Sequence, residues 1–248
     1  MERHLARFTV HSFDVDAFGQ LWPPALSGYL QEAAGGSAEQ LGFSMGELAR
    51  RGLTWVLARQ RVELHASVRL GDTLEVETWP SGVDRLAALR DFVVRRGGQE
   101  VGRAVTAWLA LDVASRRPVR AAEILPPSLH AQPEHVLPPP SARLPEPGTP
   151  LVEHPFRVRF ADIDVNEHVT NASYLGWALE AIDEETWRGL RVTGFEAHFL
   201  AEVRLGGRIL SRSAPDGAGA RLHQVVREED GREVARLRTS WAPRGPGA

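Results

Sequence analysis

The chain of 248 residues contains no cysteine and no lysine, so all 29 of its basic residues are arginine. Without cysteine, a disulfide, a thiolate metal ligand and a cysteine nucleophile are all excluded. Asparagine is also scarce, because only Asn166 and Asn171 occur. Both lie in one short polar segment, and this concentration of a rare residue type indicates that another polar residue would not serve there.

The chain also lacks a strong excess of charge and a long apolar run. Its formal net charge of −3 gives no global basis for binding nucleic acid or a membrane surface. The first residues contain no apolar segment, so we expect neither a signal peptide nor a transmembrane helix, and a cytoplasmic location. A hydrophobic content of 43% and a charged content of 25% are typical of a globular protein with a substantial core.

The elements of the first half can be predicted from periodicity and turn residues. Alternating apolar residues predict a strand over 6–13, and Pro23 with Pro24 suits the first turn of a helix. Ser44–Met–Gly–Glu47 is a capping box that predicts a second, short helix. Glycine-containing turns then separate further strand-like runs, at about 53–66, 73–79, 85–96 and 100–112.

A proline-rich segment interrupts this pattern. Ten prolines lie between residues 113 and 150, which predicts an extended connector without packed elements. We therefore expect a first domain over residues 1–125, a linker over 126–150 and a second domain over 151–248.

After the connector, the pattern of the first half starts again. Phe8–Asp16 aligns with Phe156–Asp164 without a gap (164 − 16 = 148). Two further matches follow in the same order, Val68–Arg–Leu–Gly with Val203–Arg–Leu–Gly and Val101–Trp108 with Val234–Trp241. Three ordered matches predict a duplicated unit of one strand, a turn, a long helix and about four strands. A long helix against an antiparallel sheet is an α+β arrangement.

Three polar residues, Asp164, Asn166 and His168, alternate along the segment before the second predicted long helix. In extended backbone, alternate residues face the same side, so we expect these side chains to converge. Thr170 or Asn171 can cap the helix that follows. Free N–H groups at a helix start can hold a developing oxyanion, so we favour a catalytic site over a turn that only caps the helix.

The two halves differ where this chemistry would lie. Only the second half carries the full polar set, because Asn166, His168 and Glu202 stand opposite Phe18, Gln20 and Ser67. This asymmetry is typical of a fused pair of units in which one of two ancestral sites has lapsed. We therefore expect one site, in the second half.

Several motifs of the chain belong together. They are Leu53–Thr–Trp–Val–Leu–Ala–Arg59, Gly71–Asp72, Thr78–Trp79, Ala104–Val–Thr–Ala–Trp108 and Arg116–Arg–Pro–Val in the first half, and Asp162–Ile–Asp–Val–Asn–Glu–His–Val and Tyr174–Leu–Gly–Trp177 in the second. With these motifs, nearly the whole chain resembles the double-hotdog acyl-acyl carrier protein thioesterases of bacteria and plant plastids. The resemblance implies two tandem hotdog folds and hydrolysis of the thioester that holds a fatty acyl chain on carrier protein.

The chain departs from the family pattern at two positions. Thr170 stands where the family usually has Asn, which changes the helix cap. Many plant members have a Cys after the catalytic Glu, but here that position is Val203. A Cys–His–Asn mechanism is therefore impossible. The first residues do not resemble the plastid targeting segment of plant members, so we expect a bacterial protein.

The resemblance implies that Asp164, Asn166, His168 and Glu202 form the catalytic set, with no metal or organic cofactor. Glu202 would deprotonate the attacking water. Its apolar neighbours predict a largely buried strand, and burial would increase the basicity of this carboxylate. His168 would orient the water or polarise the thioester oxygen. Asn166 would donate to that oxygen, and Asp164 would fix its neighbours, although in single-hotdog hydrolases the Asp is itself the base or nucleophile.

Aromatic residues of the first half suggest where an acyl chain could bind. Trp55, Met45 and Trp79 could line an acyl tunnel, although an aromatic core is the simpler interpretation. Tyr174 and Trp177 are expected in the core of the second half, with a place in the substrate wall as the alternative, and Asp162 is expected in a turn.

Rival functions remain open at this stage. An acyl-CoA thioesterase would use the same chemistry on a different carrier, and a non-catalytic acyl-binding protein would keep the fold without the reaction. A hotdog hydratase is disfavoured, because its Asp–x–Asn–Pro–x–His motif places Asp and His five apart, whereas Asp164 and His168 are four apart. The expected partner is acyl carrier protein, and a monomer and a homodimer are both compatible with the sequence.

Overall fold

The computed structural model describes residues 3–130, 135–165 and 167–245. The chain divides into two compact units. One unit comprises the chain to Leu21 and Gly28–Pro140, and the other comprises Trp22–Ser27 and the chain from Ser141. Among the described residues, no helix is both long enough and apolar enough to cross a membrane.

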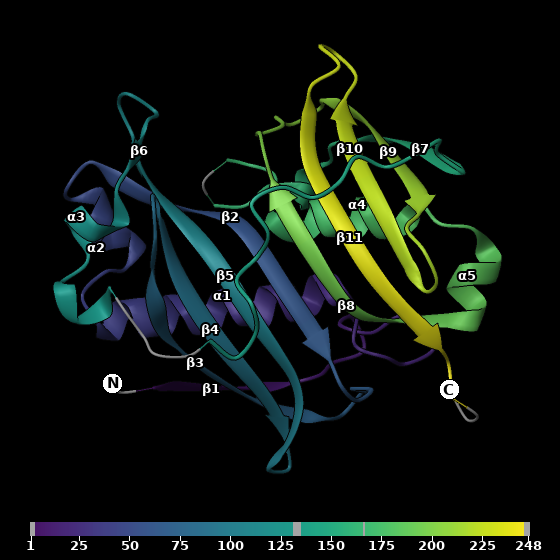
Figure 1. Cartoon of the computed structure of the whole chain (residues 1–248), viewed down its shortest axis with the longest axis horizontal. Coiled ribbons are helices and arrows are strands. Elements are labelled where there is room, and N and C mark those ends of the chain that lie inside the picture. Colours follow the sequence, from purple (N-terminus) through teal and green to yellow (C-terminus); the bar gives the residue numbers. More distant parts are fainter. Residues whose placement is uncertain (1–2, 131–134, 166, 246–248) are drawn as a thin grey trace. The chain divides into compact units, whose positions relative to one another are not determined.

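The first unit is an antiparallel sheet with one long helix (Figure 1). In spatial order, its strands are β1 (His4–Thr9), β3 (Thr73–Asp84), β4 (Ala87–Arg96), β5 (Gln99–Asp112) and β2 (Leu53–Leu64). Helix α1 (Pro23–Gln40) begins at the predicted proline pair. Helix α2 (Met45–Ala49) is capped by Ser44, whose hydroxyl accepts from the Glu47 N–H at 3.3 Å, as the capping box predicted.

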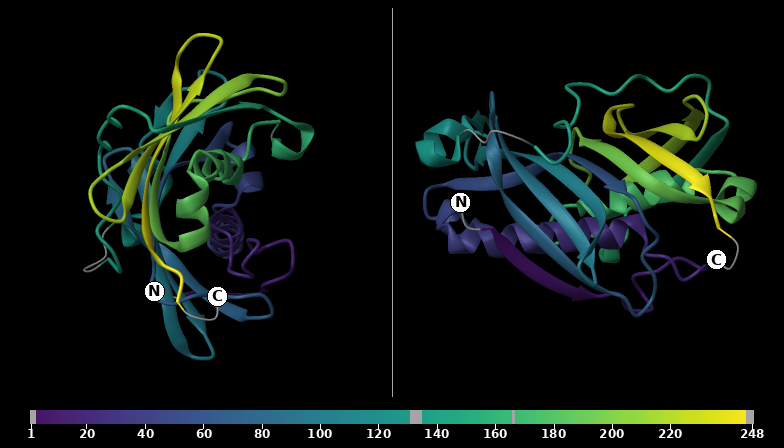
Figure 2. Two further views of the ribbon diagram at one scale, coloured as in Figure 1. Left: turned by 90° about the vertical axis from the view of Figure 1, so that its right-hand side faces the viewer. Right: turned by 60° about the horizontal axis from the view of Figure 1, so that its bottom comes forward.

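The second unit repeats this arrangement (Figure 2). In spatial order, its strands are β7 (Val152–Arg157), β9 (Arg208–Pro215), β10 (Ala220–Arg227), β11 (Glu233–Pro243) and β8 (Leu190–Phe199). Helix α4 (Asn171–Glu180) packs against β9, β10 and β11, and α5 (Glu184–Gly189) follows it. An antiparallel sheet against a helix in each unit confirms the predicted α+β class.

The predicted duplication is also visible in individual hydrogen bonds. In the first unit, the Val10 N–H donates to the Asp72 carbonyl at 2.9 Å, and the Gly71 N–H donates to the Val10 carbonyl at 2.9 Å. In the second unit, Val158 exchanges the same pair of bonds with Gly207 and Gly206, at 2.9 and 3.1 Å. Gly71 and Gly206 both have positive φ, which glycine adopts without strain. The Val–Arg–Leu–Gly match therefore marks the same turn in both units.

The proline-rich segment is more closely packed than its composition predicts. It contains the short strand β6 (Pro118–Val119), which pairs with β5, helix α3 (Ala121–Ile124) and the 3₁₀ turn η1 (Pro127–Leu129). Its leucines are buried at positions 125, 129, 137 and 144. The proline content predicted an extended backbone. It did not predict the packing, because that depends on the leucines between the prolines, which are buried.

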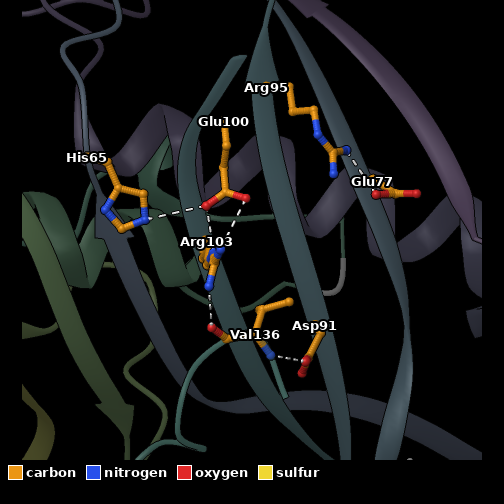
Figure 3. Close-up of polar contacts among 7 residues, drawn as sticks. All are labelled: His65, Glu77, Asp91, Arg95, Glu100, Arg103 and Val136. Carbon is orange, nitrogen blue, oxygen red and sulfur yellow. Dashed lines mark hydrogen bonds and ion pairs between the residues drawn. The ribbon is translucent and has the colours of Figure 1, made fainter. Parts of the chain in front are cut away.

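Two strands of the first unit hold the connector at Val136 (Figure 3). Asp91 on β4 is fully buried, and its carboxylate accepts from the Val136 N–H at 2.7 Å. Arg103 on β5 donates to the Val136 carbonyl at 3.3 Å and is itself held by Glu100 at 2.6 Å. Both backbone groups of Val136 are therefore bound by charged side chains, which fixes this point of the connector on the sheet.

The second unit holds the connector by the equivalent arginine. The Val101–Trp108 match pairs Arg103 with Arg236, and Arg236 donates to the Leu144 carbonyl at 3.1 Å. Glu233 accepts from Arg236, as Glu100 does from Arg103. The two arginines differ in exposure, because the Arg236 side chain is 6% exposed and the Arg103 side chain 42%.

This difference in exposure predicts unequal effects on stability. Arg236→Met should lower the free energy of unfolding by about 2–3 kcal/mol, because it leaves a half-buried carboxylate and a buried carbonyl without their donor. Arg103→Met should cost less than about 1 kcal/mol, as is usual for an exposed ion pair. Urea denaturation of both variants measures the difference, and equal losses would contradict the assignment of Arg236 as the stronger anchor.

Candidate active site

The predicted catalytic segment forms a tight turn rather than extended backbone. The Asp164 N–H donates to the His168 carbonyl at 2.8 Å, and the Glu167 N–H donates to the Asp164 carbonyl at 3.0 Å. The Asp164 carboxylate accepts from the His168 N–H at 3.2 Å. The prediction of extended backbone is therefore wrong for the described residues of this segment. Asn166 lies outside the described residues.

The first unit contains the same turn. Asp16 exchanges backbone bonds with Gln20 and Gly19 at 2.8 and 3.0 Å, and its carboxylate accepts from the Gln20 N–H at 3.0 Å. Both aspartates of the repeat thus close a turn through backbone groups. The residue at positive φ is Gly19 in the first unit (φ 71°) but Glu167 in the second (φ 62°). A non-glycine residue there stores strain of about 1 kcal/mol, which is common beside functional sites.

The structure brings His168 and Glu202 together. The His168 Nε2 atom lies 3.6 Å from the Glu202 carboxylate, although 34 residues separate them in the chain (202 − 168 = 34). Their side chains are 42% and 44% exposed, so the pair faces solvent. Glu202 lies in the loop after β8, which ends at Phe199, and the predicted buried strand around Glu202 is therefore wrong.

Tyr174 of α4 holds the loop that carries Glu202. Its buried hydroxyl donates to the Ala201 carbonyl at 3.3 Å and accepts from the Val203 N–H at 3.1 Å. Burial raises the pKa of Tyr174 to about 12, so the hydroxyl stays protonated and can donate. Tyr174 therefore binds the residues on both sides of Glu202. Tyr174 is buried, as expected for a core residue, but its contacts with this loop were not predicted. The rarity of tyrosine in this chain was the available signal for a specific role.

This arrangement predicts that Tyr174 positions the carboxylate of Glu202. Tyr174→Phe should lower the free energy of unfolding by about 2 kcal/mol, because the buried Val203 N–H loses its acceptor. It should also lower kcat while leaving KM nearly unchanged, because Glu202 loses its fixed position.

The matched control is Tyr29→Phe, at the only other tyrosine of the chain. The Tyr29 hydroxyl donates to Asp14 at 2.7 Å in the first unit, so this variant should lose stability and keep kcat. Denaturation and steady-state kinetics on the two variants separate positioning from folding. Equal kcat values for both would remove Tyr174 from the site.

The start of α4 is fixed by a second set of polar contacts. Thr170 caps the helix, accepting from the Ser173 N–H at 3.1 Å, as one of the two predicted caps. Asp162, which is buried in the 3₁₀ turn η2 (Phe160–Asp162), accepts from Arg159 and from the Ser173 hydroxyl. Although burial opposes the shift, the hydrogen bonds from Arg159 hold the pKa of Asp162 below its usual value. Asp162 therefore lies in a turn, as predicted, and it also stabilises the start of α4, which was not predicted.

A carboxylate and an imidazole at this separation can both contact one small molecule that lies beside them. Glu202 can accept a proton, and His168 can donate or accept one. A water molecule within reach of both groups can therefore be oriented and deprotonated. Within the described residues, no three His, Asp or Glu side chains lie close enough together to hold a metal ion.

The first unit contains an apolar cavity of about 170 Å³ between α1, the sheet and the loops after α1 and α3. Trp55 and Met45 line it, as the tunnel interpretation predicted, together with Trp108, for which no such role was predicted. Trp79 is not among its lining residues; it is buried beside Arg3, whose guanidinium lies 4.0 Å from the indole ring.

Comparison with known families accounts for both units. Residues 2–126 match the acyl-ACP thioesterase N-terminal domain, and residues 147–243 match the acyl-ACP thioesterase C-terminal domain. The chain belongs to the acyl-ACP thioesterase family. The resemblance inferred from the sequence motifs is thereby confirmed.

Plant members of the acyl-ACP thioesterase family are longer than this chain. An acyl-[acyl-carrier-protein] hydrolase of Cuphea viscosissima is 27% identical over 263 residues, which cover 97% of this chain and 63% of the relative. An oleoyl-acyl carrier protein thioesterase of Arabidopsis thaliana is 30% identical over 203 residues, which cover 72% of this chain and 54% of the relative. The chain thus spans less than two thirds of the length of these relatives.

Solved structures of acyl-ACP thioesterases share the fold. The enzyme of Bacteroides thetaiotaomicron matches with a TM-score of 0.87 at 24% identity, over 97% of this chain and 98% of that chain. A 12:0-ACP thioesterase of Umbellularia californica matches with a TM-score of 0.86 at 23% identity, over 98% of each chain. These matches confirm the tandem hotdog fold that the motifs implied.

Proposed function

We propose that this member of the acyl-ACP thioesterase family hydrolyses the thioester that joins a fatty acyl chain to acyl carrier protein. The observation that carries the proposal is the pairing of His168 and Glu202 at 3.6 Å in the unit that matches the family's C-terminal domain. The first unit, with Gln20 and Ser67 at these positions, has no equivalent pair of side chains.

In the proposed reaction, Glu202 acts as the general base. It takes a proton from a water molecule, whose oxygen attacks the thioester carbonyl and forms a tetrahedral intermediate. That intermediate releases the fatty acid and the thiol of the carrier, which receives the proton. His168 orients the water, and Asn166 donates to the developing oxyanion.

Asp164 has an indirect role in this proposal. Its carboxylate accepts from the backbone of His168, just as the carboxylate of Asp16 accepts from the backbone of Gln20. Because Asp16 makes this contact in a unit without the catalytic set, the contact itself serves the turn. Asp164 therefore supports the position of His168 instead of taking the proton from water.

We further propose a division of labour between the two halves. Residues 1–125 supply the surface for the acyl chain, residues 126–150 connect the halves, and residues 151–248 supply the chemistry. The apolar cavity lined by Trp55 and Met45 supports the first of these assignments. A cytoplasmic location and a monomeric or homodimeric state stay predictions.

The carrier decides between this proposal and the acyl-CoA alternative. Hydrolysis of dodecanoyl-ACP should exceed that of dodecanoyl-CoA in kcat/KM, because the family match covers both units. The two substrates carry the same acyl group, so the difference reports the carrier alone. Equal or faster hydrolysis of the CoA ester would move the assignment to an acyl-CoA thioesterase.

A further inference from the structure

The cavity of the first unit carries one charged side chain, Arg90, on an otherwise largely apolar wall. Arg90 lies on β4 next to Asp91, and successive residues of a strand face opposite sides of the sheet. Asp91 binds the connector at Val136 on one face of the sheet, and Arg90 lines the cavity on the other, together with Ala88 and Trp108. The sheet thus separates this cation from the nearest carboxylate in the sequence.

Arg90 is buried without a counter-charge. It is 8% exposed, and its Nη1 atom donates to the Thr78 hydroxyl at 3.3 Å. The Thr78 hydroxyl in turn donates a hydrogen bond to the Asp91 carbonyl at 2.8 Å. No carboxylate in the described part of the chain forms an ion pair with Arg90, whereas the half-buried Arg95 of the same strand pairs with Glu77 at 2.9 Å (Figure 3).

The guanidinium keeps its charge in this position. Burial lowers the pKa of Arg90 to about 10, which is still well above neutral pH. A buried cation is costly unless an acceptor or an anion compensates it. A plain alkyl chain that fills this cavity places hydrocarbon against the guanidinium and supplies neither.

We propose that this cavity binds an aliphatic chain that ends in a carboxylate, with the carboxylate held by Arg90. The chain packs against the apolar wall that includes Trp55, Leu89 and Trp108, and the carboxylate accepts from the planar guanidinium, whose geometry suits two parallel bonds. Such a group can be the head of a free fatty acid or the distal end of a dicarboxylic acyl chain. The second source rests on the proposed function, and binding of a free fatty acid does not.

Binding of octanoate and of 1-octanol, which have the same chain length, tests the proposal by calorimetry. The wild-type protein should bind octanoate at least about 10-fold more tightly than 1-octanol, since a bond between charged partners is stronger than one to a neutral hydroxyl. Arg90→Met should reduce this preference to about onefold, and Arg90→Lys should retain part of it. Arg95→Met is the matched control on the same strand and should keep the full preference.

Two results overturn the proposal. One is equal binding of octanoate and 1-octanol by the wild type, which needs no variant to fold. The other is an unchanged preference in Arg90→Met with a wild-type circular dichroism spectrum. Because Trp55 and Trp108 line the cavity, the octanoate titration should also change the tryptophan fluorescence, and this change should be lost in Arg90→Met.

Hydrolysis identifies the source of the carboxylate. One outcome is faster turnover of a carrier-bound eight-carbon chain with a terminal carboxylate than of octanoyl carrier protein. If Arg90→Met abolishes this difference, Arg90 binds the distal carboxylate of a substrate. Competitive inhibition by octanoate that depends on Arg90, with no such substrate preference, supports the free fatty acid. Arg90-dependent binding without hydrolysis of any acyl carrier substrate leaves this inference standing and overturns the proposed function instead.

Discussion

Glu202→Gln should lower kcat for acyl-ACP hydrolysis by roughly 100-fold or more, which is the usual contribution of a general base. Gln keeps the size of the side chain and removes its ability to take a proton. The side chain is half-exposed, and the loop is held by contacts of other residues, including Tyr174 with Val203 and Arg227 with the Glu202 carbonyl. The free energy of unfolding should therefore change by less than about 0.5 kcal/mol.

Glu229→Gln is the matched control for this prediction. Glu229 is an exposed carboxylate in the turn after β10, outside the loop that Tyr174 holds. Its substitution should leave kcat within about twofold of the wild type. A Glu202→Gln protein that stays folded and keeps more than a tenth of the wild-type kcat would exclude Glu202 as the base.

His168→Gln should also lower kcat by roughly 100-fold, because the attacking water loses the imidazole that orients it. The change gives the second half the residue that the first half has at Gln20. The turn should survive, because Asp164 binds the backbone N–H of residue 168 and not its imidazole. Gln at the equivalent position of the first unit closes the same turn with the same bonds.

An exposed histidine elsewhere in the second unit provides the control for His168→Gln. His154 on β7 stacks on Phe156 and lies outside the turn, so His154→Gln should leave kcat nearly unchanged. Thermal unfolding of both variants by circular dichroism shows whether the fold is kept. Wild-type turnover by a folded His168→Gln protein would limit His168 to a structural role.

The duplicated architecture could be predicted from the sequence because the repeated residues include glycines and aspartates that particular backbone conformations require. Gly71 and Gly206 have positive φ in equivalent turns, and Asp16 and Asp164 accept from equivalent backbone groups. The proline pair at residues 23 and 24 and the Ser44 cap predicted the starts of α1 and α2, since proline lacks the free N–H group there and serine satisfies one. Such features can be predicted from the local sequence alone, because they do not depend on contacts with distant residues.

The geometry of the site was harder to predict from the sequence. Alternating polar residues predicted extended backbone, but Asp164 competes for a local N–H and closes a turn instead. Glu202 was placed in a strand because its neighbours are apolar, yet β8 ends before it and the loop is held by Tyr174 from another element. Contacts between side chains far apart in the sequence decide such positions, and periodicity does not report them.

The cavity shows the same limit. Residue type made Trp55 and Met45 possible lining residues, but Trp79, chosen on the same ground, does not line the cavity, and Arg90 was not predicted to line it. An arginine in a sequence is most often exposed, and only the fold shows that this one is buried on the cavity side of β4.

The most direct test of the site is kcat for dodecanoyl-ACP hydrolysis by the double variant His168→Gln/Glu202→Gln beside the two single variants. If the two residues act on one water as a unit, the fold reduction of kcat in the double variant should equal that of the more damaged single variant. Independent residues would instead give a reduction equal to the product of the two single reductions. A folded double variant with wild-type kcat would place the chemistry outside this pair.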